Sequence, residues 1–366
     1  MVAKAKAAMN LSQIFPDTPI DFRRFSRELA ENEDLSDAVR GALDVEVTTR
    51  AVVFGGASLP PPVKRKSRED WIEVGIEAVH KTAENPDAAL TPFEDAALEA
   101  IVRLQNRPAL LIRNDSFPEP PEYWARLNQF RAEISAGIPR VGRIDAREGE
   151  MVGTGFVVAE SLIMTNRHVV KYFADPSLEE GGPWSIHSSA RPTINFRMEY
   201  GEAAQSIFRI TKVAAVHPRE FTDLALLEVE QQAIEPGGAP LPAPVKLSST
   251  APKMNSNLQL YAIGYPYTDN GDSTPPEVIE AIYENIFQVK RLQPGEFGSM
   301  LDQYSAFSHD CSTLGGNSGS LVMDLARNQV IGLHFKGKYR QANYAVALWL
   351  MKSDELFQGR KLNYVD

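Results

Sequence analysis

The sequence predicts an all-β fold of two six-stranded barrels, preceded by a mainly α-helical N-terminal domain. Apolar residues recur at helical spacing from about residue 10 to residue 105, whereas short apolar strands separated by turns dominate from Val141 onward. A connection rich in proline and glycine, 235–244, divides these strands into two groups. Two such groups fit a pair of antiparallel barrels with a site in the cleft between them.

The N-terminal region predicts a bundle of about four helices. Its clearest helix start is at Thr91, where a threonine N-cap, a proline in the first turn and a glutamate three residues on precede a helical pattern. Residues 60–66 read Pro-Pro-Pro-Val-Lys-Arg-Lys, which favours a solvated loop over a localisation or nucleic-acid patch. Earlier apolar faces are formed by Phe22, Phe25 and Leu29, and by Leu35, Val39 and Leu43.

A Pro-rich acidic linker is expected to follow the bundle, and then a short amphipathic helix. Trp124, Leu127, Phe130 and Ile134 form its apolar face, and the helix is expected to end at Gly137. Because it runs directly into the first strand, this face is expected to pack on the barrels. The predicted domains are residues 1–105, helical and regulatory; 106–139, linker and amphipathic helix; and 140–366, the barrels.

The expected strands have apolar runs bounded by turn residues. The region 267–302 is instead expected to be a variable loop. A calcium site at its run Asp269–Asp272 is the less favoured alternative, since the spacing fits no EF-hand. A closing helix is expected over 349–357. The first group of strands is 141–144, 151–158, 162–165, 193–200, 206–216 and 224–229, and the second is 258–263, 286–291, 320–323, 330–334 and 343–348.

Three stretches carry groups suited to nucleophilic catalysis. Ser318 lies between glycine residues in a Gly-Gly-Asn-Ser-Gly run, where backbone N–H groups are free of any strand ladder. His168 follows a strand, and Asp223 begins a strongly apolar one. A serine hydroxyl needs an imidazole to take its proton, and the imidazole needs a carboxylate to fix its tautomer. Taken singly, these residues could also be a turn serine, a polar strand end and a strand cap.

These stretches resemble the chymotrypsin/trypsin-like serine peptidases, and among them the bacterial glutamyl endopeptidases. The resemblance spans about residues 141–350 and follows the order His, Asp, Ser. It implies that Ser318 is the nucleophile, His168 the general base and acid, and Asp223 the orienting carboxylate. The N–H groups of Gly316 and Ser318 would form the oxyanion hole. The matching runs are Gly153-Thr-Gly-Phe-Val-Val, Thr165-Asn-Arg-His, Asp223-Leu-Ala-Leu-Leu and Gly316-Asn-Ser-Gly-Ser.

The resemblance also suggests a substrate preference. In glutamyl endopeptidases the positions matching Thr313 and His334 contact an acidic side chain, so cleavage after Glu or Asp is expected; a structural strand histidine is the alternative for His334. Secreted members use a freed N-terminal amine near this pocket, whereas about 140 residues precede the barrels here. Asn317 replaces the aspartate that pairs with a new N-terminus in digestive zymogens, so we expect control by loop ordering or by a partner.

Composition narrows the partners. The formal net charge of −10 argues against nucleic acid, which requires a basic surface. No 18-residue apolar run and no signal-peptide pattern is present, which predicts a cytoplasmic protein without a membrane segment. Cys311 is the one cysteine and is expected to be a buried structural thiol rather than a second nucleophile. No metal or other cofactor is predicted.

The leading hypothesis is an intracellular serine endopeptidase that cuts a protein or peptide. The helical domain is weakly similar to effector-associated or death-fold-like domains that precede peptidases in bacterial defence systems. We therefore expect it to bind a regulatory protein, although a cap that merely covers the barrels is also consistent with the sequence. The rival hypothesis is a catalytically dormant adaptor that uses the same fold to bind a peptide or protein partner.

Overall fold

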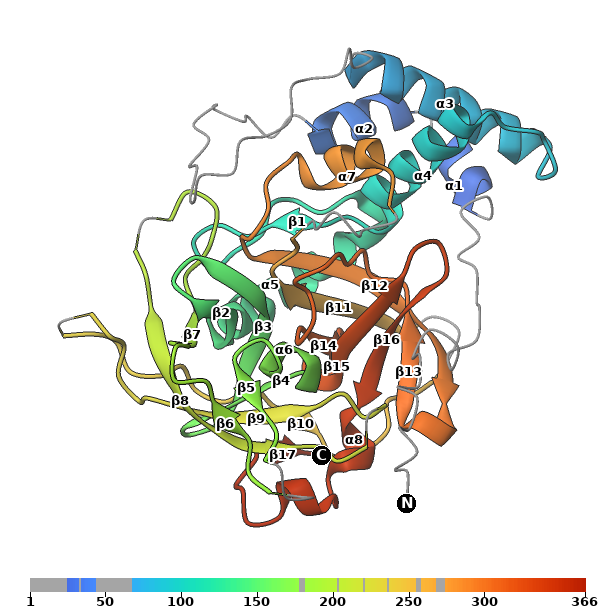
Figure 1. Cartoon of the computed structure of the whole chain (residues 1–366). Coiled ribbons are helices and arrows are strands. Elements are labelled where there is room, and N and C mark those ends of the chain that lie inside the picture. Colours follow the sequence, from blue (N-terminus) through green and yellow to red (C-terminus); the bar gives the residue numbers. More distant parts are fainter. Residues whose placement is uncertain are drawn as a thin grey trace, which may run out of the picture.

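A helical bundle lies at one end of two β-barrels (Figure 1). The structure is a computed structural model that describes residues 25–32, 34–43, 68–177, 182–202, 204–219, 221–235, 237–254, 258–267 and 274–366. The predictions made for Phe22, the side chain of Leu43, residues 60–66 and Asp269–Asp272 lie outside these described parts. None of the helices in the described ranges combines the length and apolar character needed to cross a bilayer.

The predicted four-helix bundle is present in the described N-terminal residues. It consists of α1 Ser26–Ala30, α2 Leu35–Leu43, α3 Arg68–Glu84 and α4 Pro92–Asn106. The start of α4 confirms the predicted capping box: the Glu94 N–H donates to Thr91 Oγ1 at 3.2 Å, and the Thr91 N–H donates to Glu94 Oε2 at 2.6 Å. The bundle core contains Phe25, Leu29, Leu35, Val39, Ile72, Val79, Leu98, Ile101 and Val102.

The first barrel confirms the six strands predicted before residue 230. Its strands close in the order β2-β3-β4-β9-β8-β7, and all neighbouring pairs are antiparallel. Alternate apolar side chains fill its interior, as the period of two requires. The bounds are β2 Val141–Arg147, β3 Glu150–Ala159, β4 Leu162–Thr165, β7 Thr193–Asn195, β8 Ile207–Val216 and β9 Ala225–Val229; a small pair outside the barrel is β5 Ala174–Asp175 and β6 Ser185–Ile186.

The second barrel also has six strands, in the order β14-β11-β12-β13-β16-β15, and pairing of β14 with β15 closes the ring. Three short strands extend its sheet beyond the ring. The bounds are β11 Gln259–Gly264, β12 Arg291–Leu301, β13 Ala306–His309, β14 Leu321–Asp324, β15 Gln329–Lys338 and β16 Ala342–Ala347; the added strands are β1 Leu110–Leu111, β10 Leu247–Ser248 and β17 Tyr364–Val365.

Three predictions about this half were wrong. The expected loop 267–302 contains α7 Pro276–Tyr283 and the strand β12, and the predicted strand 286–291 is irregular up to Arg291. Strand β12 begins with polar residues and includes Pro294, so it lacks an apolar alternation, and β13 was missed. The closing helix is only α8 Leu348–Met351 and a separate 3-10 turn, which Asp354 caps by accepting from the Leu356 N–H at 2.9 Å.

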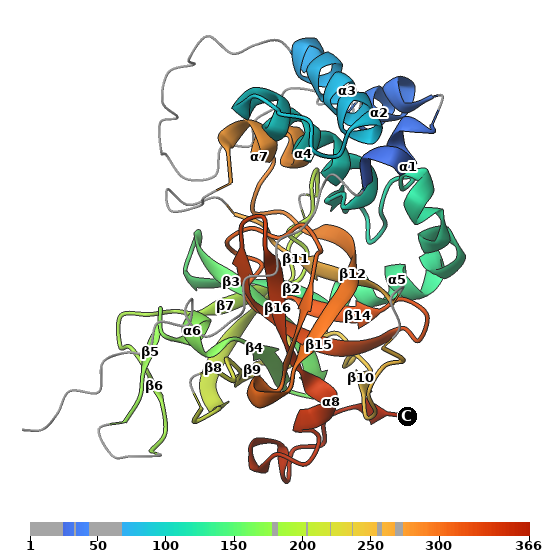
Figure 2. The same cartoon turned by 90° about the vertical axis from the view of Figure 1, so that its right-hand side faces the viewer.

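The segment after the bundle is attached to the second barrel rather than hanging free as a linker. Strand β1 pairs with β12, placing Leu110 opposite Leu292. The predicted amphipathic helix is a 3-10 helix, Glu122–Phe130, followed by α5 Arg131–Gly137 and a final 3-10 turn, Ile138–Arg140. Its apolar residues join the core of the barrels, which confirms the expected packing. In both views α4 and α7 lie together above β11 and β12 (Figures 1 and 2).

Candidate active site

Strand pairing brings His168 and Asp223 together. Strands β4 and β9 are antiparallel neighbours, and Thr165 at the end of β4 lies opposite Ala225 at the start of β9. The chain just after β4 and the chain just before β9 therefore leave the barrel at the same edge. His168 lies on α6 Arg167–Val170, directly after β4, and Asp223 precedes β9 by two residues.

The Asp223 carboxylate holds His168 through two contacts. One carboxylate oxygen, Oδ1, accepts from the His168 backbone N–H at 3.0 Å, and Oδ2 is 2.5 Å from the ring Nδ1. The Asp223 side chain is only 7% exposed, whereas that of His168 is 38% exposed. A buried carboxylate next to Nδ1 favours the tautomer that carries its proton there. This leaves Nε2 available as a proton acceptor on the solvent side.

The loop that carries Ser318 is held against the first barrel by Thr154 of β3. The Thr154 N–H donates to the Ser318 carbonyl at 2.8 Å, and its hydroxyl donates to the Gly316 carbonyl at 2.8 Å. Gly153, beside Thr154, lies close to both the Ser318 carbonyl and Val169, the residue after His168. Residues from the two barrels thus meet at this point, where the Ser318 carbonyl and the residue after His168 both lie next to Gly153.

Gly319 is required by the geometry of this loop. Its φ is +90°, and an added Cβ would lie 1.9 Å from the Thr154 carbonyl oxygen. Both the backbone conformation and the lack of space exclude a side chain here. The glycine after Ser318 therefore allows the nucleophile loop to approach β3.

The backbone N–H groups of Gly316 and Ser318 each belong to a peptide bond whose carbonyl already accepts a hydrogen bond. The Gly315 carbonyl accepts from the Tyr267 N–H at 2.7 Å, and the Asn317 carbonyl accepts from the Ser320 N–H at 2.8 Å. Because the C=O and N–H of a trans peptide point in opposite directions, these contacts fix the directions of the Gly316 and Ser318 N–H groups. Neither N–H donates a hydrogen bond within the described residues. This pair can stabilise an oxyanion.

Asn317 is fully buried, and a neutral contact holds it. Its Oδ1 accepts from Gln293 Nε2 on β12 at 2.8 Å, and Gln293 is itself fully buried. An amide pair of this kind needs no new N-terminal ammonium to compensate a charge. The loop is therefore held in place in the uncleaved chain.

The two predicted specificity residues lie on neighbouring segments of the second barrel. Thr313 precedes the nucleophile loop, and its hydroxyl donates to Asn343 Oδ1 at 2.7 Å. His334 lies on β15, where its backbone N–H donates to the Ser320 carbonyl and its carbonyl accepts from the Gly319 N–H, both at 2.9 Å. A Cβ added at Gly337 would come within 3.5 Å of Thr313 Oγ1, so β15 and Thr313 face each other.

A second histidine stands behind His334. His309 Nε2 is 3.2 Å from His334 Nδ1, and His309 Nδ1 has no hydrogen-bond partner among the described residues. A buried N–H without an acceptor is rarer than a buried acceptor without a donor. We therefore assign the proton between the rings to His309 Nε2, which leaves the proton of His334 on Nε2.

Both histidines are neutral near pH 7. Burial lowers the pKa of His309 to about 4, and burial together with His309 and His168 holds the pKa of His334 well below its usual range. In the free protein His334 is therefore a neutral imidazole whose Nε2–H can donate a hydrogen bond. Cys311 is buried, and burial raises the pKa of its thiol, which makes it unsuited to act as a nucleophile.

Known proteins are similar to this chain over the same region. Residues 153–333 match the family model described as a trypsin-like peptidase domain. A probable serine protease of Lysobacter enzymogenes is 29% identical over 296 residues, covering 71% of this chain and 75% of that protein. A glutamyl endopeptidase of Staphylococcus aureus (strain MW2) is 28% identical over 205 residues, covering 56% of this chain and 52% of the relative. This chain thus spans about half the length of that relative.

Solved structures also match part of this chain at low sequence identity. The crystal structure of Deg5 has 21% sequence identity and a TM-score of 0.41, covering 63% of this chain and 92% of that chain.

Sequence reasoning missed the role of Thr154. It lies between Gly153 and Gly155, in a run that was recognised as part of a motif but given no function. The signal was the pair of glycines, which indicates close approach of another backbone.

Proposed function

We propose that this chain is a serine endopeptidase that uses Ser318, His168 and Asp223, because residues 153–333 match a trypsin-like peptidase domain and its relatives include serine proteases. The observation that supports this most is the double contact between Asp223 and His168, beside a loop whose Gly316 and Ser318 N–H groups lack partners within the described residues. Orientation of the base and stabilisation of the oxyanion are both required for acyl transfer.

The chemistry follows from these positions. Ser318 Oγ attacks the peptide carbonyl carbon while its proton passes to His168 Nε2. Asp223 stabilises the imidazolium, and the two N–H groups stabilise the negative oxygen. His168 then gives its proton to the leaving amine, which leaves an acyl-enzyme on Ser318. Water, deprotonated by the same ring, releases the acid product.

We also propose a preference for Glu or Asp before the cleaved bond. The His334 Nε2–H would donate to the substrate carboxylate, and the Thr313 hydroxyl would turn its proton from Asn343 Oδ1 to the same carboxylate. This carboxylate would raise the pKa of His334. Lys336 and Lys338 lie on either side of Gly337 in β15, and burial and then the charge of Lys338 lower the pKa of Lys336. An acidic substrate would relieve this repulsion. The positive charge of these two lysines on β15 thus favours acidic peptides.

Other roles stay predictions from the sequence. These are the cytoplasmic location, the place in a bacterial defence or signalling pathway, and a regulatory protein that binds the helical bundle. The bundle packs on the barrel that carries the proposed nucleophile, so a protein that binds the bundle would be able to alter that barrel.

The test of this proposal is hydrolysis of a peptide series that differs only in the residue before the bond: Glu, Asp, Gln, Leu and Lys. The wild-type protein should hydrolyse the Glu and Asp peptides, and Ser318→Ala should hydrolyse none. His334→Leu should reduce the ratio of kcat/KM for Glu over Gln by about tenfold, the cost of one hydrogen bond to a charged group. Turnover with no acidic preference would keep the peptidase and refute the pocket assignment. Peptide binding without turnover would favour the dormant adaptor.

A further inference from the structure

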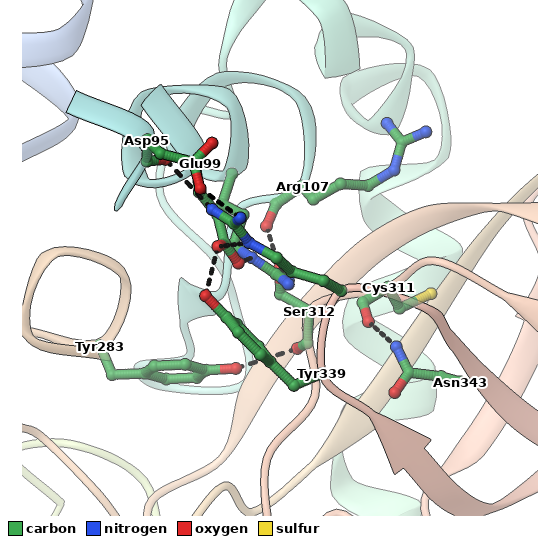
Figure 3. Close-up of polar contacts among 10 residues, drawn as sticks. Asp95, Glu99, Arg107, Tyr283, Cys311, Ser312, Tyr339 and Asn343 are labelled. Carbon is green, nitrogen blue, oxygen red and sulfur yellow. Dashed lines mark hydrogen bonds and ion pairs between the residues drawn. The ribbon is translucent and has the colours of Figure 1, made fainter. Parts of the chain in front are cut away.

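Helix α4 contacts the chain segment that leads into the nucleophile loop. Ser312 is 1% exposed, and its side chain is turned toward the helix. Its hydroxyl donates to the Arg107 carbonyl at 2.7 Å and accepts from Arg103 Nη1 at 3.1 Å (Figure 3). The next residue, Thr313, instead contacts Asn343 on β16. One side of this segment is thus held by α4, and the other faces the proposed substrate.

Helix α7 supports the same segment from a second direction. The Tyr283 hydroxyl donates to the Ser312 carbonyl at 3.1 Å (Figure 3). Leu314 is buried in an apolar cluster with Val278, Ile279 and Ile282 of α7. Helices α4 and α7 pack on each other, so they form one support behind residues 312–314.

Helix α4 also holds the β15–β16 hairpin, which forms the other wall of the proposed substrate pocket. At the turn between β15 and β16, Glu99 of α4 accepts from the Tyr339 hydroxyl at 2.6 Å and from Arg340 Nε at 2.7 Å. Arg340 also pairs with Asp95 of α4. Because Gly337 and His334 lie on this hairpin, α4 connects both walls of the proposed substrate pocket through side chains one turn apart.

Glu99 links the contact at Ser312 with the contact at the β15–β16 turn. Its carboxylate is fully buried and also pairs with Arg103 at 2.8 Å, the residue that reaches Ser312. Burial alone would raise the pKa of Glu99, but Arg103, the Tyr339 hydroxyl and Arg340 hold it below its usual range, so it is charged. Two guanidinium groups and two carboxylates balance in this cluster, which argues against a charged ligand site. Its rigid, charge-assisted contacts instead suit a role in positioning.

We propose that Glu99 and Arg103 are positioning residues for the substrate pocket, because α4 holds Ser312 on one wall and Tyr339 and Arg340 on the other at a fixed separation. This inference rests on the proposed peptidase function. It makes the helical bundle part of the specificity apparatus: a displacement of α4 would change the pocket without touching Ser318, His168 or Asp223.

The test compares Arg103→Met and Ser312→Ala with the wild type. Each should raise KM for an acidic peptide by about tenfold while changing kcat by less than about threefold. Labelling of Ser318 by a small fluorophosphonate, which does not fill the pocket, should keep its rate within about threefold. Arg103→Lys retains a cationic donor and should recover most of the lost affinity. The double variant should lose less than the sum of the two single losses, since both variants remove the Arg103–Ser312 contact, and each also removes one contact of its own, to Glu99 or to the Arg107 carbonyl.

The matched control is Lys81→Met. It breaks an ion pair to Glu94 at 3.0 Å, which also involves α4 but lies on the partly exposed side of the bundle. Its KM should equal that of the wild type. Unchanged KM in both Arg103→Met and Ser312→Ala, or additive effects in the double variant, would overturn the inference.

A second measurement separates this inference from the proposed function. Amide hydrogen exchange of segments 311–316 and 335–341 should be faster in Arg103→Met than in Lys81→Met, whether or not the protein is active. Equal exchange in the two variants would refute the positioning role. A wild-type protein that neither turns over peptides nor reacts with the fluorophosphonate would refute the peptidase function instead.

Discussion

Replacing Asp223 by asparagine isolates its proposed role with little change in shape. Asp223 Oδ1 accepts from the His168 backbone N–H, and this contact survives in Asn. At the second position an NH₂ group would then face His168 Nδ1, where Oδ2 lies now. Since the NH₂ group can only donate, Nδ1 must become an acceptor and the ring proton must move to Nε2. The base then has no lone pair facing Ser318.

The expected loss follows from this change of tautomer. Asp223→Asn should reduce kcat about ten-thousandfold near pH 7, equivalent to about 5 kcal/mol of transition-state stabilisation. KM should change little because Asp223 does not face the proposed pocket. The free energy of unfolding should fall by only about 1–2 kcal/mol, since one hydrogen bond is kept.

Steady-state kinetics on the best peptide, with urea unfolding in parallel, measures both effects. Asp354→Asn is a matched control: Asp354 Oδ2 lies 3.3 Å from His217 Nε2, a histidine–carboxylate contact that includes neither His168 nor Asp223. Its kcat should equal that of the wild type. A loss below tenfold in Asp223→Asn, or an equal loss in both variants, would refute the assignment.

Three further predictions concern the nucleophile loop and the pocket. Gln293→Met leaves the buried Asn317 Oδ1 with only its longer contact to the Ser320 hydroxyl, so stability should fall by about 1–3 kcal/mol and kcat should fall with it, as measured by urea unfolding and peptide turnover. Gly319→Ala combines a φ of +90° with contact at the Thr154 carbonyl, so it should cost about 2 kcal/mol or more and abolish turnover; wild-type stability would contradict this. The folded-state pKa of His309, about 4, lies below its unfolded value. The contribution of neutral His309 to the free energy of unfolding is therefore complete above about pH 6.5 and is lost as the pH falls toward 4. This amounts to about 3 kcal/mol, and thermal unfolding of His309→Gln should show a weaker pH dependence between these limits.

Residues with a strong local signal were predicted well. The strands of the first barrel contain short apolar runs, and Thr91 carries a complete capping box. His168, Asp223 and Ser318 could be found because each lies in a short run of distinctive residues at a strand end. Their relative positions could not be derived from sequence alone. These positions depend on the pairing of β4 with β9 and on the hydrogen bond from Thr154 in the first barrel to the Gly316 carbonyl in the second.

The missed features share a different physical basis. Strand β12 begins with Arg291, whose guanidinium is buried and donates to the Tyr283 carbonyl at 2.7 Å, so tertiary contacts compensate a polar residue that local pattern places outside. The contact between Arg103 and Ser312 joins positions 209 residues apart. From sequence, Arg103 is only a basic residue in the last turn of a helix, which is favourable for the helix dipole and needs no partner.

The most direct test of the central claim is the mass of the intact protein after reaction with a fluorophosphonate, followed by peptide mapping. The account predicts one adduct per chain, located on Ser318, in the wild-type protein. The adduct should be absent in Ser318→Ala and form far more slowly in Asp223→Asn. An unmodified wild-type protein, or an adduct on any other residue, would contradict the account.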